Sequence, residues 1–210
     1  MFALSPDDRP YRLTIWGIAL GILAFAAIQS GYAWQIGNRQ LLKDGLDWGY
    51  DVVLYAIAAI VFGRGLRAEH LAALLVGGVM ALAGFHTLYD LWDKIVTPRP
   101  IQLAPLGFSA LSAMTIGLLV VAVLARFRQS RNALVLATWL SARNALIGTA
   151  AFAALAFVTR SAPVRWPEYT LDVFLAGLNF QAAWAIWRAT RKAADVAAEM
   201  PTQAAGVETK

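Results

Sequence analysis

The stretch from Gly37 to Asp51, GNRQLLKDGLDWGYD, decides how this chain is interpreted, because it brings three carboxylates into an otherwise apolar region. Asp44, Asp47 and Asp51 are separated by three and four residues, a spacing that aligns side chains along one face of a helix. At the centre of a membrane helix, a carboxylate costs about 2.5–3.5 kcal/mol on insertion scales, so it normally faces a bundle interior, a partner or an ion path. The stretch therefore predicts a helix with an acidic stripe inside a helical bundle.

The composition around this stretch is typical of an integral membrane protein. Hydrophobic residues make up 59% of the 210 residues and charged residues only 15%, and the mean hydropathy is +0.56, which is far from the balance of a soluble domain. Apolar runs close to the roughly 20 residues that cross a bilayer recur along the whole chain. They cover residues 12–34, 44–63, 69–93, 103–125, 133–158 and 167–187.

These runs predict an all-α fold, an integral membrane bundle of six transmembrane helices with no room for a soluble domain. The expected organisation is a cytoplasmic N-terminal segment over residues 1–11, a six-helix domain over residues 12–190 and a short flexible cytoplasmic tail over residues 191–210.

Basic residues in the short loops predict the orientation, because cytoplasmic loops carry an excess of Lys and Arg. With the N-terminus inside, the cytoplasmic side receives Arg9, Arg12, Arg64, Arg67, Arg126, Arg128, Arg131, Arg188, Arg191 and Lys192. The opposite side receives Arg39, Lys43, Lys94, Arg99, Arg160 and Arg165. Both termini are therefore expected in the cytoplasm. The net charge of +5 is explained by topology and by contact with anionic lipid, so no nucleic-acid partner is predicted.

The sequence does not predict an enzyme. It lacks a glycine-rich phosphate loop and a serine with a convincing histidine partner, and it contains two histidines and no cysteine. Without a thiolate, any metal ion has to be held by oxygen or imidazole ligands. We expect no tightly bound cofactor.

Four segments, in order, resemble the cation diffusion facilitator family. GNRQLLKDGLDWGYD is similar to the end of the first and the start of the second helix of that family. The later segments resemble its third, fifth and sixth helices: LAALLVGGVMALAGFHTLYDLWDKIVTP after Arg67-Ala68-Glu69, WLSARNALIGT and WPEYTLDVFLAGLNFQAAW. The resemblance covers most of residues 37–190. It is strongest to a short, single-domain branch that has Asp-x-x-x-Asp in the second helix and lacks the cytoplasmic C-terminal domain.

This resemblance implies efflux of a divalent metal ion such as zinc, cadmium, cobalt or iron in exchange for protons. Asp47 and Asp51 would occupy the two metal-ligand positions of the second helix, and the transported ion would be zinc or a similar metal. Protons and metal ions compete for such ligands, which couples their movements. The resemblance also implies a homodimer, and a short chain with several spans and no cysteine fits a bacterial inner (plasma) membrane.

The fifth helix of the resemblance departs from the family pattern. Aligning WLSARNALIGT with that helix places Ser141 and Ala145 at its two ligand positions, and neither is a usual zinc ligand. A shift of one residue offers Leu140 and Asn144 instead. Two functions therefore stay open: efflux with Ser141 or Asn144 as weak or water-mediated helpers, or a transport-incompetent homologue that acts as a structural or regulatory membrane protein.

Arg143 is a second departure from the family pattern, and its position predicts that it compensates the charge of a carboxylate on the second helix. It lies about 12 residues, or roughly 18 Å along a helix, from Arg131, while Asp51 lies about 13 residues, or roughly 20 Å, from Arg64. At this similar depth Arg143 is expected to neutralise Asp47 or Asp51, and the alternative is that it turns toward a carbonyl or water.

Other polar residues of the apolar runs have simpler explanations beside functional ones. Asp44 would be a proton relay or an outer acid that receives ions. His86 and Asp90 have the spacing of a metal site, but a hydrated interfacial pair is the favoured interpretation. Asp172, with Asn179 and Gln181, would line a water path or make hydrogen bonds between helices.

Overall fold

The protein is described by a computed structural model that covers residues 8–97, 108–130, 132–161 and 165–207. Every regular element of these residues is helical, which confirms the all-α prediction. The helices are α1 (Asp8–Gln35), α2 (Arg39–Val61), α3 (Leu66–Val96), α4 (Phe108–Leu124), the 3-10 turn η1 (Ala125–Phe127), α5 (Ala133–Ser161) and α6 (Trp166–Val207).

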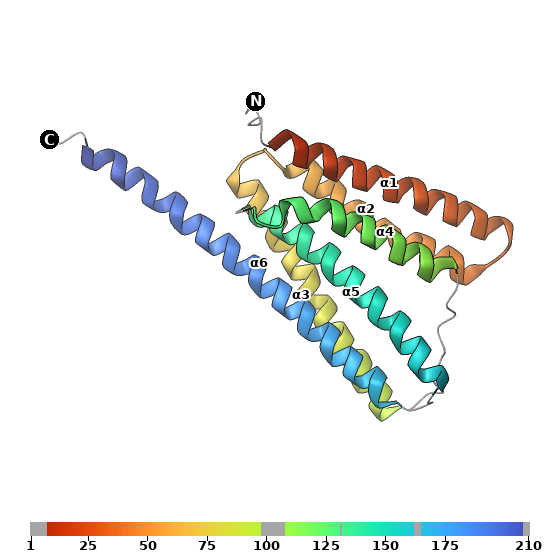
Figure 1. Ribbon diagram of the computed structural model, residues 1–210. Helices are drawn as coiled ribbons and strands as arrows, with labels where there is room; N and C mark the ends of the chain where they lie inside the picture. Colours follow the sequence, from red (N-terminus) through yellow and green to blue (C-terminus); the bar gives the residue numbers. More distant parts are fainter. Residues whose placement is uncertain (1–7, 98–107, 131, 162–164, 208–210) are drawn as a thin grey trace.

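Each of the six predicted apolar runs overlaps one of the six α-helices, and the largest difference lies at the C-terminal end. There α6 continues to Val207 and projects beyond the bundle (Figure 1), although the sequence analysis assigns the stretch from residue 191 to a flexible tail. The stretch is rich in alanine, which has the highest intrinsic helix propensity and so favours continuation of the helix.

Two helices among the described residues are long and apolar enough to cross a membrane. They are Arg9–Gln35, with a mean hydropathy of 1.8, and Leu66–Val96, with a mean hydropathy of 1.9. Shorter apolar stretches lie at Trp48–Val61 and Leu111–Phe127. By length and composition, these two helices are therefore candidates for crossing a membrane.

The helices pack as two groups that meet along α5. α1 and α2 form a hairpin, α3 runs along α6, and α5 contacts α3, α4 and α6. The hairpin turns at Gly37, whose φ of +66° suits a residue without a Cβ. Asn38 then caps α2, because its Oδ1 accepts the N–H of Leu41 at 3.0 Å. In Figure 1 the α1–α2–α4 group and the α3–α5–α6 group diverge away from the end where α6 projects.

The narrow end of the bundle holds the most deeply buried polar contacts. Tyr11 and Thr138 share a buried hydrogen bond of 2.8 Å, and the Tyr11 ring packs on Phe62 with the centroids 4.5 Å apart. Glu69 is 7% exposed. Its carboxylate accepts the N–H of Gly63 and the amide of Asn132, each at 2.6 Å, and so joins the loop before α3 to the start of α5.

Glycines allow α3 and α6 to approach closely. A Cβ placed on Gly84 would lie 3.0 Å from the ring of Phe180, and one on Gly77 would lie 3.3 Å from Ile186. Gly78, between them in sequence, has no atom within 4 Å of its Cβ position. Small residues at a helix interface favour association in lipid, where the hydrophobic effect between helices is weak.

Gly84→Leu is therefore expected to destabilise the α3–α6 pair, because overpacking of this kind typically costs about 1–3 kcal/mol. Thermal unfolding in detergent, followed by circular dichroism, should show a lower Tm than wild type. Gly78→Leu is the matched control, since it adds the same side chain on the open face of the same helix. Leucine has a higher helix propensity than glycine, so an equal loss of Tm in both variants would contradict the contact with Phe180 as the cause.

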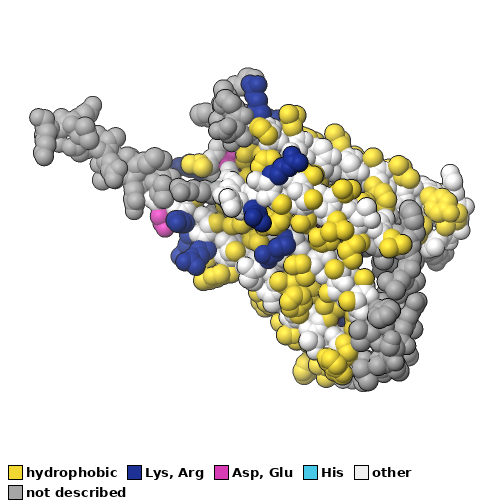
Figure 2. Space-filling model, in the orientation of Figure 1, with side chains coloured by type: hydrophobic (Ala, Val, Ile, Leu, Met, Phe, Trp, Pro, Cys, Tyr) yellow, Lys and Arg dark blue, Asp and Glu magenta, His cyan; other side chains and the backbone are white. Residues whose placement is uncertain are grey.

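The outer surface of the bundle is apolar along most of its length. Large hydrophobic side chains are exposed on every helix group, for example Leu13 (73%), Ile28 (71%), Leu82 (69%) and Leu111 (70%). Figure 2 shows yellow hydrophobic side chains spread over the body, whereas the dark blue Lys and Arg side chains gather on the half from which α6 projects. The described basic residues at that end are Arg9, Arg12, Arg64, Arg67, Arg126, Arg128, Arg188, Arg191 and Lys192. Arg131 lies outside the described residues.

Candidate functional site

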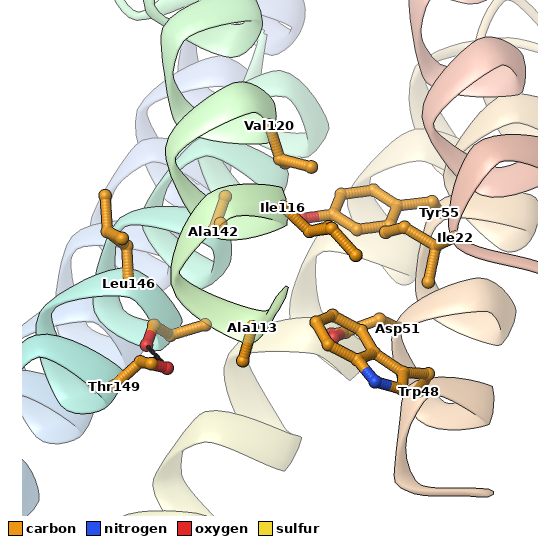
Figure 3. A pocket seen from close by; sticks show the side chains of 12 residues that line it. Ile22, Trp48, Asp51, Tyr55, Ala113, Ile116, Val120, Ala142, Leu146 and Thr149 are labelled. Atoms are coloured by element: carbon orange, nitrogen blue, oxygen red, sulfur yellow. Dashed lines mark hydrogen bonds between the residues drawn. The ribbon is translucent and has the colours of Figure 1, made fainter. Parts of the chain in front are cut away.

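A cavity of about 260 Å³ lies where α1, α2, α4 and α5 meet. Its walls are mainly apolar, and Figure 3 shows side chains from all four helices pointing into it. The lining residues are Ile22, Trp48, Asp51, Tyr55, Ala113, Ile116, Gly117, Val120, Ala142, Ala145, Leu146 and Thr149. Asp51 supplies the one carboxylate among these residues.

α2 places Asp51 in the cavity through its helical period. Trp48, Asp51 and Tyr55 are spaced by three and four residues, so they share one face of α2. Tyr55 is 3% exposed, and the Trp48 ring packs edge to face on Phe25 of α1 with the centroids 5.5 Å apart. The predicted inward orientation of the acidic face is thus confirmed for Asp51. Trp48 and Tyr55, one turn before and after it on α2, pack against the rest of the bundle.

The structure describes the backbone of Asp44 and Asp47 within α2 but not their side chains. Both residues therefore keep the roles that the sequence predicts for them, as untested predictions. Among the side chains that are described, no three His, Asp or Glu residues come close enough to hold one ion together.

α5 presents the opposite wall through Ala142, Ala145, Leu146 and Thr149. Of the two predicted ligand positions, Ala145 therefore faces the cavity of Asp51, whereas Ser141 lines a different cavity on the other side of α5. Ala145 offers no donor atom. The hydroxyl of Thr149, one helical turn later, lies at the wall and donates to the carbonyl of Ala145 at 3.0 Å. Sequence reasoning missed Thr149, although its spacing of four residues from Ala145 would have indicated it.

Arg143 does not pair with Asp51, so this half of the prediction is wrong in this structure, whereas a pair of Arg143 with Asp47, whose side chain is not described, stays an untested prediction. Its guanidinium donates to Oδ1 of Asn144 at 3.0 Å and to Oε1 of Gln181 on α6 at 2.8 Å. The reason is the helical register, because Arg143 lies about 100° around α5 from Ala142, which faces the Asp51 cavity. The amide of Asn144 in turn donates to the carbonyl of Leu178 at 2.9 Å. Arg143 and Asn144 thus tie α5 to α6.

The charge of Asp51 is therefore uncompensated among the described side chains, because none of their ion pairs involves it. An unpaired carboxylate inside an apolar bundle is costly and is normally retained for binding or proton transfer.

A second polar cluster lies where the C-terminal end of α3 meets the N-terminal end of α6. Nζ of Lys94 is 2.7 Å from Oδ2 of Asp172 and 3.1 Å from Oε1 of Glu168. Asp172 is 3% exposed, so the predicted hydrogen bonding between helices is confirmed for this residue in the form of an ion pair. Sequence reasoning did not foresee Lys94 as its partner, because the two residues are 78 positions apart.

His86 and Asp90 form the exposed pair that the sequence favours. Nδ1 of His86 lies 3.2 Å from Oδ2 of Asp90, and the two side chains are 75% and 48% exposed. The two residues lie one helical turn apart on the C-terminal half of α3, and the interfacial interpretation of the pair stays a prediction.

A comparison with protein-family models finds no match to this chain, and a comparison with curated proteins finds none either. The resemblance to the cation diffusion facilitators therefore rests on the residues quoted for it above.

Proposed function

We propose that this chain is a six-span membrane protein of the cation diffusion facilitator type, which exports a divalent metal ion such as zinc in exchange for protons. The observation that carries this proposal is the position of Asp51, a carboxylate without an ionic partner among the described side chains, in a cavity lined by four helices. Such a carboxylate can bind either a metal ion or a proton, and competition between the two couples their transport.

The surface of the molecule supports the membrane part of the proposal. Soluble monomers rarely expose apolar patches larger than a few hundred Å², and here large hydrophobic side chains are exposed along the whole bundle. The basic residues at the end with the N-terminus and the projecting part of α6 favour a cytoplasmic location for that end. We infer six spans in a plasma membrane, the inner membrane if the source is bacterial.

Asp47 completes the proposed half-site. It precedes Asp51 by one helical turn in α2, and a helix brings side chains with this spacing together. On the α5 side the hydroxyl of Thr149 and bound water would supply the remaining oxygen ligands, since Ala145 has none. A site with two carboxylates and water suits a weakly held, exchangeable ion better than a resident one.

The second candidate function is that of a structural or regulatory membrane protein without transport. The observation that favours it is again on α5: Ala145 lacks a ligand atom and Ser141 faces another cavity. In this case Asp51 would remain from a transport site that no longer functions, or it would bind water in the bundle.

Uptake measurements in proteoliposomes distinguish the two functions. Zinc, cadmium, cobalt and ferrous iron are supplied in turn under an imposed pH gradient, and wild type is compared with the Asp47→Ala/Asp51→Ala double variant. Flux that requires the gradient and is lost in the double variant supports the antiporter. Absence of flux for all four ions, in protein that elutes as one species and keeps its helical circular dichroism, supports the second function.

A further inference from the structure

A second cavity, of about 370 Å³, lies between α3, α5 and α6, on the opposite side of α5 from Asp51. Several of its walls are polar, although they belong to the middle and outer parts of apolar helices. The polar lining residues that matter here are Thr87, Asp90, Ser141, Asn144, Asp172 and Asn179. A cavity holds water when it is large enough and offers polar partners, and this cavity has the volume for several water molecules and side-chain donors and acceptors along its wall.

Lys94 stands at the outer end of this cavity and lines it together with Asp172. The side chain of Asp172 is only 5% exposed, whereas that of Lys94 is 33% exposed. The ammonium of Lys94 therefore lies between the exterior and a buried carboxylate, with Glu168 as its second partner at 3.1 Å. Asp90, on the same helix as Lys94, adds a further negative charge to the lining.

One residue is shared by the linings of the two cavities. Ala145 lines both the second cavity and the cavity of Asp51, and its side chain is only a methyl group. Gly148, three residues further along α5, lines the second cavity. The shortest route between the two cavities therefore passes the small side chain of Ala145.

We propose that the cavity between α3, α5 and α6 is an aqueous pathway from the outer end of the bundle to Asp51, which conducts water and protons, and that the ion pair of Lys94 with Asp172 is its gate. The role in proton supply rests on the proposed antiport. The hydration of the cavity and the gating by Lys94 do not depend on it. Breaking the ion pair would free the Lys94 side chain to swing outward and open the mouth of the pathway.

The absence of cysteine from the sequence allows a direct test by single-cysteine labelling. Ser141→Cys and Asn179→Cys place a thiol in the cavity, and Phe174→Cys places one on the outer face of α6, where Phe174 is 49% exposed. Right-side-out vesicles are treated with the membrane-impermeant reagent methanethiosulfonate ethyltrimethylammonium. Thiols react as thiolates and need contact with water, so both cavity cysteines should react at least about tenfold faster than Phe174→Cys.

The gate is tested by adding Lys94→Met to the Ser141→Cys and Asn179→Cys variants, with Lys94→Arg as the matched control. We expect faster labelling with Lys94→Met and little change with Lys94→Arg, which retains the positive charge. All variants are compared by gel filtration and circular dichroism before labelling, so that unfolded protein is not counted as reactive.

Labelling of both cavity cysteines as slow as that of Phe174→Cys, also in the presence of Lys94→Met, would overturn the pathway. The labelling result and the metal-flux result test the pathway and the antiport proposal separately. Fast labelling without metal flux would retain the pathway and reject antiport, whereas metal flux that depends on Asp51, combined with unreactive cavity cysteines, would retain antiport and reject this pathway.

Discussion

Asp51→Asn is expected to reduce metal uptake driven by a pH gradient to the level of vesicles without protein. Asparagine has nearly the same volume as aspartate, so the cavity between α1, α2, α4 and α5 should keep its shape. The amide carries no negative charge and does not ionise at neutral pH, so it can neither ligate the metal ion as a carboxylate does nor take up the transported proton. The measurement is zinc entry into proteoliposomes, recorded with a fluorescent zinc indicator trapped inside.

Two further variants show whether the effect belongs to the site. Asp51→Glu retains the carboxylate and should keep part of the flux, with an altered dependence on zinc concentration because the carboxylate moves by one methylene group. Asp195→Asn removes an exposed carboxylate from the projecting part of α6 and should transport like wild type. Wild-type flux in Asp51→Asn would exclude Asp51 as the residue that binds the transported ions.

The helical fold could be predicted from hydropathy because each α-helix overlaps an apolar run, although among the described residues only Arg9–Gln35 and Leu66–Val96 are long and apolar enough to cross a membrane. The prediction is wrong for residues 191–207, where intrinsic helix propensity rather than hydropathy is decisive. The alanine-rich sequence there continues α6 without an apolar run. Helix ends were predicted less well: the second run begins at residue 44, whereas α2 begins at Arg39, because hydropathy does not register the cap that the Asn38 side chain forms.

The site was predictable on α2 and less so on α5. On α2 the spacing of the acids and the neighbouring Trp48 and Tyr55 define one inward face, and the structure has Asp51 on that face. On α5 both faces meet other helices, so the sequence alone does not show which cavity a residue lines. Ser141 and Arg143 face toward α3 and α6 for this reason.

The ion pair of Lys94 with Asp172 was missed for a related reason. Lys94 follows an apolar run near the predicted outer surface, where a solvated lysine is the usual expectation. Only the packing of α3 along α6 brings it to a carboxylate 78 residues away. Long-range polar pairs of this kind depend on helix rotation, which hydropathy does not determine.

Ala145→Asp is expected to raise the affinity for zinc at least about tenfold, because a hydrogen bond or contact with a charged group contributes about 1.5–3 kcal/mol and 1.4 kcal/mol corresponds to a factor of ten. The new carboxylate would extend into the same cavity as Asp51 and supply the ligand that α5 lacks. Calorimetric titration of the purified protein with zinc at fixed pH measures the change.

Ser141→Asp is the matched control, because it adds the same group to the same helix but on the wall of the other cavity. It should leave zinc affinity close to that of wild type, and Asp51→Asn should cancel the gain produced by Ala145→Asp. An equal gain from Ser141→Asp would contradict a site shared by α2 and α5. Wild-type protein that binds no zinc, beside an Ala145→Asp variant that does, would favour the structural or regulatory function, since the missing α5 ligand would then explain a lost transport site.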